Sequence, residues 1–170
     1  MGTDTFTDGA GTDAFRVEIF DAAASVSTID ILKDFTTSQS DTFTLIENGL
    51  GLTNSDLRGD GTGFQVADFK GGTALGTDTG FLVNNGSNSI DLEISTIISE
   101  LTLGDASNSV TASDSFFYLT DNGAASRLFQ FTDTNGDANI GSGEVTGVAT
   151  FELVSDATDI TASLVTDFAA

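Results

Sequence analysis

The chain has 170 residues, enough for one domain with a substantial core, and its formal charge is −21, from 26 acidic and 5 basic side chains. Histidine and cysteine are absent, which excludes His-based triads, thiol nucleophiles, disulfides and zinc sites built on those ligands. Hydrophobic residues make up 39% of the chain and include 14 phenylalanines, too many for a disordered acidic tail. The negative charge disfavours nucleic acid and anionic membranes, and we expect no membrane insertion because no apolar run is long enough.

The first feature in chain order is a nine-residue repeat, with copies at residues 2–7 (GTDTFT) and 11–16 (GTDAFR). Residues 8–16 match the calcium-binding pattern G-G-x-G-x-D-x-U-x, where U is large and apolar, except that Asp8 replaces the first glycine. Glycines in such a turn let backbone carbonyls converge, and the aspartate adds a carboxylate, as calcium requires. The predicted ligands here are Asp4, Gly9, Gly11 and Asp13. The simpler alternative is an ordinary Gly-Asp turn that recurs by chance.

Residues 30–45 (DILKDFTTSQSDTFTL) place aspartates between apolar residues. Together with the preceding repeats, this segment resembles the D-x-I-x-D-F-x-x-G-x-D-x-I-x-L junction that closes the calcium roll in RTX proteins of the serralysin type. Asp30, Leu32, Asp34 and Phe35 match the first half of this pattern. Asp41, Phe43 and Leu45 match the second half one position later than in the family, and the stretch between the halves lacks the family's glycine. The resemblance implies that Asp30, Asp34 and Asp41 are calcium ligands, that the chain leaves the cell through a type I exporter, and that it folds outside on meeting calcium. Without the resemblance, the segment predicts a strand, a polar turn and a second strand.

Short runs rich in Thr, Val, Ile and Phe predict β-strands, and glycine, asparagine and aspartate must make the turns because proline is absent. The predicted strands are residues 41–45, 80–83, 115–120, 127–132 and 145–153. Residues 121–126 (DNGAAS) predict a hairpin turn, and residues 84–86 (NNG) predict another turn. Residues 95–101 carry apolar side chains at helical spacing behind a Ser or Thr cap and predict a short helix, and residues 161–168 are a second candidate.

The segment 133–144 (DTNGDANIGSGE) has the length and polarity of an EF-hand calcium loop. Positions one, three, five, seven and twelve of that loop are occupied here by Asp133, Asn135, Asp137, Asn139 through its backbone carbonyl, and Glu144. The sixth position is Ala138 where EF-hands have glycine. Because strands rather than helices flank it, we predict an EF-like loop in a β context. A polar Asn-Gly-Asp turn is the alternative.

These features predict a mainly β fold, with a short calcium β-roll fragment packed on an antiparallel β-sandwich and one or two short helices. We expect a single domain over residues 1–170, with roll-like repeats and junction in 1–45 and the sandwich with its EF-like loop in 46–170. Weaker calcium candidates are residues 56–63, Asp78 and Asp105. The final residues 165–170 resemble the extreme C-terminus of type I secretion substrates.

The expected cofactor is Ca²⁺, and we expect no enzymatic activity, because every acid-rich segment has metal-ligand spacing or a glycine-rich turn. We expect a secreted, extracellular or cell-surface structural protein that self-assembles into a surface layer, matrix or filament, as a homo-oligomer or polymer joined by strand edges and calcium. One alternative is the C-terminal secretion module of a larger adhesin or hydrolase, and another is a binding protein for a small ligand or carbohydrate. Halophilic solvation is the other source of such acidity, although 20 Asp against 6 Glu favours calcium loops.

Overall fold

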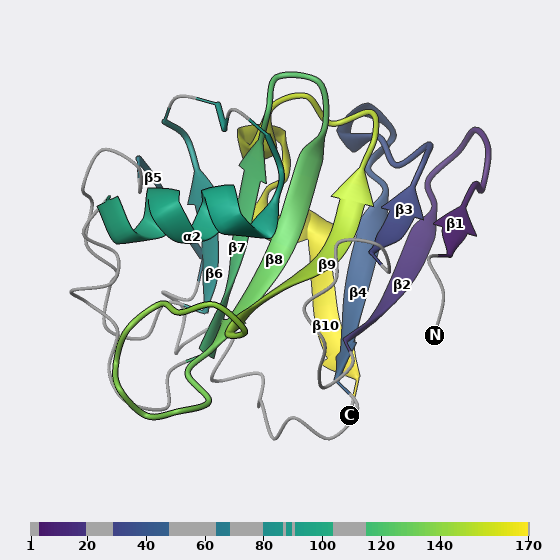
Figure 1. The fold of residues 1–170 in the computed structure, drawn as a ribbon. Coiled ribbons are helices and arrows are strands. Elements are labelled where there is room, and N and C mark those ends of the chain that lie inside the picture. The colour runs from purple at the N-terminus through teal and green to yellow at the C-terminus, as the bar shows by residue number, and fades with distance from the viewer. Residues whose placement is uncertain are drawn as a thin grey trace.

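A computed structural model describes residues 4–19, 29–47, 64–68, 80–86, 88–89, 91–103 and 115–169, and confirms that the fold is mainly β (Figure 1). The strands are β1 (Thr5–Phe6), β2 (Ala14–Ile19), β3 (Asp30–Leu32), β4 (Thr42–Glu47), β5 (Phe64–Ala67), β6 (Phe81–Asn84), β7 (Ser115–Asp121), β8 (Ser126–Thr132), β9 (Val145–Phe151) and β10 (Val165–Ala169). The helices are α2 (Ile94–Leu103) and the 3-10 turns η2 (Thr37–Gln39), η4 (Ala157–Asp159) and η5 (Ala162–Leu164).

The strands form two sheets, one of seven strands in the order β1-β3-β9-β8-β7-β6-β5 and one of three in the order β10-β4-β2. Two packed sheets agree in outline with the predicted sandwich, but the antiparallel arrangement is correct only for β7, β8 and β9. All other neighbours are parallel. For the pairs β1–β3 and β2–β4 the physical reason is that consecutive strands at the N-terminus alternate between the two sheets, so each return to a sheet runs in the same direction as the strand before.

This alternation builds stacked coils, each with one strand in the large sheet and one in the small sheet. Coil 1 is residues 4–19, with β1 and β2, and coil 2 is residues 29–47, with β3 and β4. Coil 2 lies on coil 1 in register, with Phe6 opposite Leu32 and Phe15 opposite Phe43. The two copies of the nine-residue repeat therefore lie in one coil, with Phe6 on β1 and Phe15 on β2, and that coil stacks on coil 2. The strand predicted at residues 41–45 is confirmed.

A third coil comes from the far end of the chain. In residues 145–169, β9 pairs with β3 and β10 pairs with β4, both in parallel. The ladder continues with Leu32 opposite Phe151 and Phe43 opposite Val165. Strands β5 to β8 and helix α2 thus come from an insertion between the second coil and the third. The proposed boundary at residue 45 does not divide the structure, because coil 3 shares both of its sheets with coils 1 and 2.

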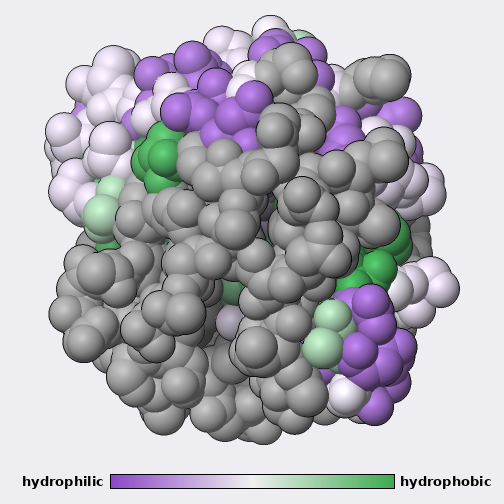
Figure 2. Space-filling model, turned by 90° about the vertical axis from the view of Figure 1, so that its left-hand side faces the viewer, coloured by the Kyte–Doolittle hydropathy of each residue, from purple (hydrophilic) through white to green (hydrophobic). Residues whose placement is uncertain are grey.

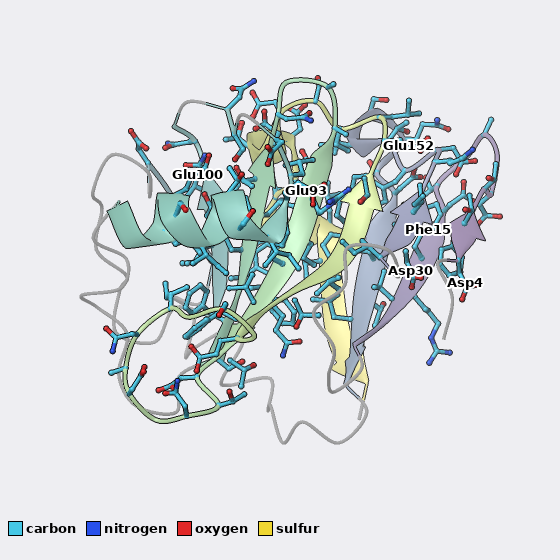
Figure 3. The ribbon with its side chains drawn as sticks, viewed as in Figure 1. Asp4, Phe15, Asp30, Glu93, Glu100 and Glu152 are labelled. Atoms are coloured by element: carbon cyan, nitrogen blue, oxygen red, sulfur yellow. The ribbon has the colours of Figure 1, made fainter. Side chains whose placement is uncertain are left out.

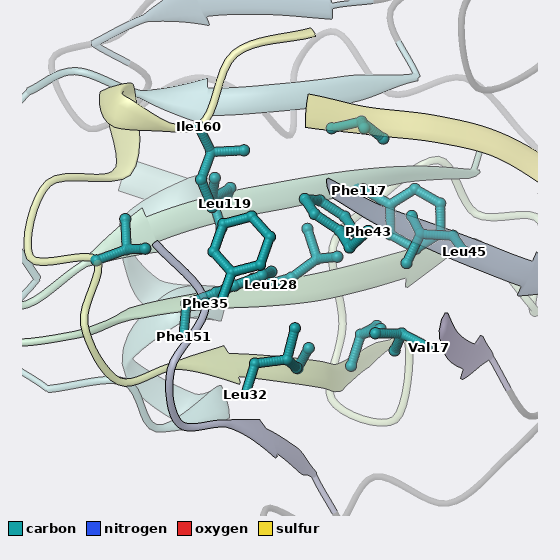
Figure 4. Close-up of a cluster of buried hydrophobic side chains, with 14 of the residues drawn as sticks. Val17, Leu32, Phe35, Phe43, Leu45, Phe117, Leu119, Leu128, Phe151 and Ile160 are labelled. Atoms are coloured by element: carbon teal, nitrogen blue, oxygen red, sulfur yellow. The ribbon is translucent and has the colours of Figure 1, made fainter. Parts of the chain in front are cut away.

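The core between the two sheets is built mainly from aromatic and aliphatic side chains (Figure 4). Phe35, in the turn between β3 and β4, has no exposed surface. Its ring centroid lies 5.7 Å from that of Phe15, 5.9 Å from that of Phe43 and 5.0 Å from that of Phe151. These three rings belong to coils 1, 2 and 3 respectively, so Phe35 links the whole stack. Tilted and edge-on ring pairs at such separations are the favoured aromatic geometries.

A second core lies on the outer face of the large sheet, where α2 packs (Figure 1). Ile97 and Leu101 of α2 are buried against Phe116, Tyr118 and other apolar side chains of that sheet. The helix predicted for residues 95–101 is therefore confirmed, one to two residues longer at each end.

Arg127 of β8 holds the chain just before α2. Its guanidinium donates to the Thr150 hydroxyl from Nε at 2.9 Å and to the Leu92 carbonyl from Nη1 at 2.7 Å. Partial burial lowers the pKa of the Arg127 guanidinium from its ordinary value. The two bonds offset the loss of hydration of this charge and fix the start of the helix over the sheet.

The hairpin predicted at residues 121–126 is confirmed, since β7 and β8 pair antiparallel up to Asp121 opposite Ser126. The helix predicted at residues 161–168 is wrong. This segment has one 3-10 turn at Ala162–Leu164 and then enters β10, where parallel pairing with β4 replaces helical hydrogen bonds. None of the helices in the described residues has the length and apolar character needed to cross a bilayer.

Candidate metal centre

Three acidic side chains converge in the loop between β8 and β9. One carboxylate oxygen from each of Asp133, Asp137 and Glu144 lies within 4.8 Å of the other two. Asp133 and Glu144 are each only 5% exposed, whereas Asp137 is exposed. Bringing three carboxylates together, two of them away from water, is unfavourable unless a cation neutralises them. The group could therefore hold a metal ion.

Backbone amides of the loop hold the two buried carboxylates in place. Asp133 accepts from the Gly136 N–H at 2.7 Å and from the Ala138 N–H at 3.2 Å. These bonds fold the first half of the loop around the Asp133 side chain. Ionised carboxylate oxygens have more than one acceptor position each, so both retain capacity for a cation.

Glu144 closes the other end of the loop. Its Oε1 accepts from the Thr134 N–H at 3.2 Å and its Oε2 from the Gly141 N–H at 2.9 Å. The buried side chain of Ile140 anchors the loop in the core beneath α2. The first and twelfth positions of the predicted EF-like loop are thus brought together by hydrogen bonds that span it.

The two asparagines predicted as ligands have local partners. Asn135 accepts from the Asp137 N–H through Oδ1 at 2.8 Å, and Asn139 donates from Nδ2 to the Asp137 carbonyl at 2.7 Å. Both side chains are exposed. The ligand roles of Asn135 and of the Asn139 backbone carbonyl stay predictions.

Ala138, at the position where EF-hands have glycine, has a φ of 59°, in the left-handed region. Such a backbone is strained for a residue with a Cβ and unstrained for glycine. The loop therefore adopts at this position the left-handed backbone typical of an EF-hand, although the Cβ of Ala138 disfavours that conformation.

Replacing Ala138 with glycine is expected to stabilise the protein by about 0.5–1 kcal/mol, because the strain outweighs the added freedom of the unfolded chain. Urea unfolding at a fixed calcium concentration measures this change. The matched control is Ala124→Gly, an exposed turn residue without positive φ, which is expected to destabilise slightly. If both variants lose stability equally, Ala138 is not strained.

Asp4 and Asp30 are neighbours where β1 and β3 begin (Figure 3), and the other predicted ligands at the N-terminus lie in the stacked turns that follow these two strands. Asp30 accepts from the Asp4 N–H at 3.1 Å. One oxygen of Asp34 accepts from the N–H groups of both Asp8, at 2.8 Å, and Gly9, at 2.6 Å. Carboxylates of coil 2 therefore accept hydrogen bonds from backbone N–H groups of coil 1. The sequence did not predict this structural role.

The same relation holds on the other side of the turn. Asp41, only 1% exposed, accepts from the Asp13 N–H at 3.0 Å and from the Thr36 N–H at 2.7 Å. Gly11 donates its N–H to the Gln39 side chain at 2.6 Å. In the described residues, the only group of three acidic side chains close enough to share an ion is the one at Asp133. Metal-ligand roles for the turn residues stay predictions.

Partial desolvation, and then the charges of Asp8, Asp41 and Asp34, raise the pKa of Asp13 above its ordinary value. A raised pKa means that ionised Asp13 is less favourable in the folded state than in the unfolded state. This penalty is present above the folded pKa and disappears as falling pH protonates the group.

Asp13→Asn is therefore expected to raise the thermal midpoint at neutral pH in the presence of a chelator. The gain should shrink as the pH is lowered through the pKa of Asp13. Asp159→Asn removes one exposed carboxylate elsewhere and controls for the change in net charge. A gain that is independent of pH, or equal in the control, contradicts this account of Asp13.

Residues 56–63, Asp78 and Asp105 lie outside the described residues. No protein-family model matches the chain, and no curated protein and no solved structure is significantly similar to it. The resemblance to RTX proteins therefore rests on sequence motifs alone, those of residues 2–45 and, less specifically, those of the C-terminal third.

Proposed function

We propose that this protein is an extracellular calcium-binding structural protein that is stabilised by calcium and assembles with copies of itself, as a subunit of a surface layer, matrix or filament, after type I secretion. The observation that carries the proposal is the convergence of Asp133, Asp137 and Glu144, two of them buried. Oxygen ligands from carboxylates suit Ca²⁺, and the binding free energy of the ion adds to the stability of the folded state.

The net charge supports calcium dependence. A charge of −21 opposes compaction, and five basic residues cannot neutralise it. Each bound Ca²⁺ removes two net negative charges and crosslinks segments that otherwise repel each other. Folding should therefore respond to calcium more strongly than to sodium at the same ionic strength.

Two strand edges support self-assembly. In the described residues, β1 lies at one edge of the large sheet and β2 at one edge of the small sheet, and both belong to coil 1. One end of the stack thus presents two edges side by side, and edge backbone groups are templates for pairing with another chain. The aspartates of this coil repel a second copy unless cations intervene.

Light scattering during a calcium titration of chelator-treated protein tests the proposal. We expect compaction followed by growth into larger particles, and no equivalent response to sodium chloride at equal ionic strength. Thr5→Pro in edge strand β1 is expected to reduce growth and leave compaction intact, since proline removes an edge N–H. The absence of any calcium response contradicts the whole proposal.

The second candidate is the C-terminal calcium-binding secretion module of a larger adhesin or hydrolase. It is favoured by the edges of coil 1, which a further coil of the same kind would continue. Compaction with calcium to a particle that stays monomeric at high concentration supports this candidate over self-assembly.

A further inference from the structure

A polar recess of about 460 Å³ lies at the carboxyl ends of the parallel strands β5, β6 and β7. Figure 2, which views the β5 side, shows hydrophilic residues gathered along the upper edge, where β6 and β7 end in Figure 1. The lining residues are Val66, Asn84, Asn85, Gly86, Asn88, Asp121, Ser155, Asp156 and Thr158. The recess is within the size range of small-ligand sites, but its lining is far more polar than is usual for them.

Buried polar groups fix the floor of the recess. Asn84, 2% exposed, donates from Nδ2 to the Thr120 hydroxyl at 3.3 Å and accepts from the Gly86 N–H at 3.2 Å. Thr120 in turn bonds Ser89, whose hydroxyl donates to Glu100 of α2 at 2.8 Å. This chain of bonds ties the recess to the helix and restricts the amide of Asn84 to one orientation.

The opposite wall is equally fixed. Asp121, 6% exposed, accepts from the Gly123 N–H at 2.9 Å and from the Ala157 N–H at 3.1 Å. Asp156 caps the turn η4 by accepting from the Thr158 N–H at 2.9 Å and from its hydroxyl at 2.7 Å. Polar groups that are already ordered lose little entropy when a ligand binds.

The chemistry of the lining selects the ligand class. None of the described residues that line the recess is basic, and the net charge of −21 repels anions, so phosphates and acidic ligands are disfavoured. A purely apolar ligand would leave the amide and carboxylate groups without partners. Asp121 and Asp156 are not part of any described group of three acidic side chains close enough to share an ion.

We propose that this recess binds a neutral saccharide. Amides supply both donors and acceptors, and carboxylates supply acceptors, which together match the paired hydroxyls of a sugar. Val66, 47% exposed, offers one apolar contact for the C–H face of the ring. This site lies on strands other than those of the calcium loop and is independent of the proposed calcium-dependent assembly.

Saturation-transfer NMR with glucose, galactose, mannose and N-acetylglucosamine, at fixed calcium, tests the proposal. We expect transfer to at least one neutral sugar and none to glucuronic acid. Asn85→Ala and Ser155→Ala each remove an exposed polar group from the recess, and each is expected to weaken binding about three- to tenfold, as the loss of one hydrogen bond predicts. Ser163→Ala, an exposed serine outside the recess, should bind as the wild type does.

Circular dichroism of each variant is the control that shows whether it remains folded. Binding that is unchanged in both recess variants, or an absence of transfer from all four neutral sugars, overturns the proposal. Equal binding of glucuronic acid overturns it too, because charge exclusion then plays no part. Broadening of the Asn84 and Asp121 resonances by Mn²⁺ alone, with no effect of sugar, assigns the recess to a cation instead.

Discussion

Replacing Phe35 with alanine is expected to lower the free energy of unfolding by about 3–5 kcal/mol, the usual loss for a large-to-small substitution of a buried phenylalanine. The ring has no exposed surface and contacts aromatic rings from all three coils. Its removal leaves a cavity where the two sheets meet, and the rings around it belong to different strands that cannot all close in. Urea unfolding at saturating calcium measures the effect.

Leu153→Ala is the matched control, because Leu153 is 59% exposed and buries little surface. Its expected change is within about 0.5 kcal/mol of zero. Phe35→Leu, which keeps part of the volume, should fall between the two variants. If Phe35→Ala costs no more than Leu153→Ala, the three coils do not share one core.

Asp137→Asn is expected to change the stability in opposite directions with and without calcium. Asp137 accepts from the Asn139 N–H through Oδ1 at 2.9 Å, and an asparagine oxygen can keep this bond while the negative charge is lost. In chelator the variant should be slightly more stable than the wild type, because one of three converging carboxylates has been neutralised.

With calcium at about 100 times the wild-type Kd, the ion stabilises the wild type by about 2.7 kcal/mol, and the variant should lose most of this gain. Thermal unfolding in chelator and in a calcium series measures both effects. Asp159→Asn, which removes one exposed carboxylate outside the loop, should show the same calcium response as the wild type. An unchanged calcium response in Asp137→Asn contradicts the assignment of this loop as a calcium site.

Local patterns were sufficient for much of the secondary structure. The apolar, Phe-rich runs of β7 and β8, the Asp-Asn-Gly turn between them and the apolar spacing of α2 each determine their element from neighbouring residues alone. The helix predicted at residues 161–168 was wrong for the opposite reason, because contacts distant in sequence decided the structure there. That short segment has no strong preference of its own, and the unpaired edge of β4 decided that it became a strand.

The candidate metal centre could also be predicted from the sequence, because its residues lie close together along the chain. Its three acidic residues lie within twelve positions of each other, so the spacing of Asp133, Asp137 and Glu144 largely determines that they meet. The polar recess could not be predicted from the sequence, because its lining residues come from separate elements with no regular spacing between them. They include Val66, Asn84, Asp121 and Asp156. Only the parallel order of β5, β6 and β7 places those strand ends together.

The sequence by itself determined the composition of the core, the acidity, the repeated turns at residues 2–16 and the loop at 133–144, since these depend on residue type and short spacing. The tertiary structure decided that residues 145–169 complete a stack begun at residues 4–47. It also decided that Asp30, Asp34 and Asp41 accept amides from the neighbouring coil. Both outcomes depend on which strand lies beside which, and that is set by the burial of side chains distant in sequence, above all around Phe35.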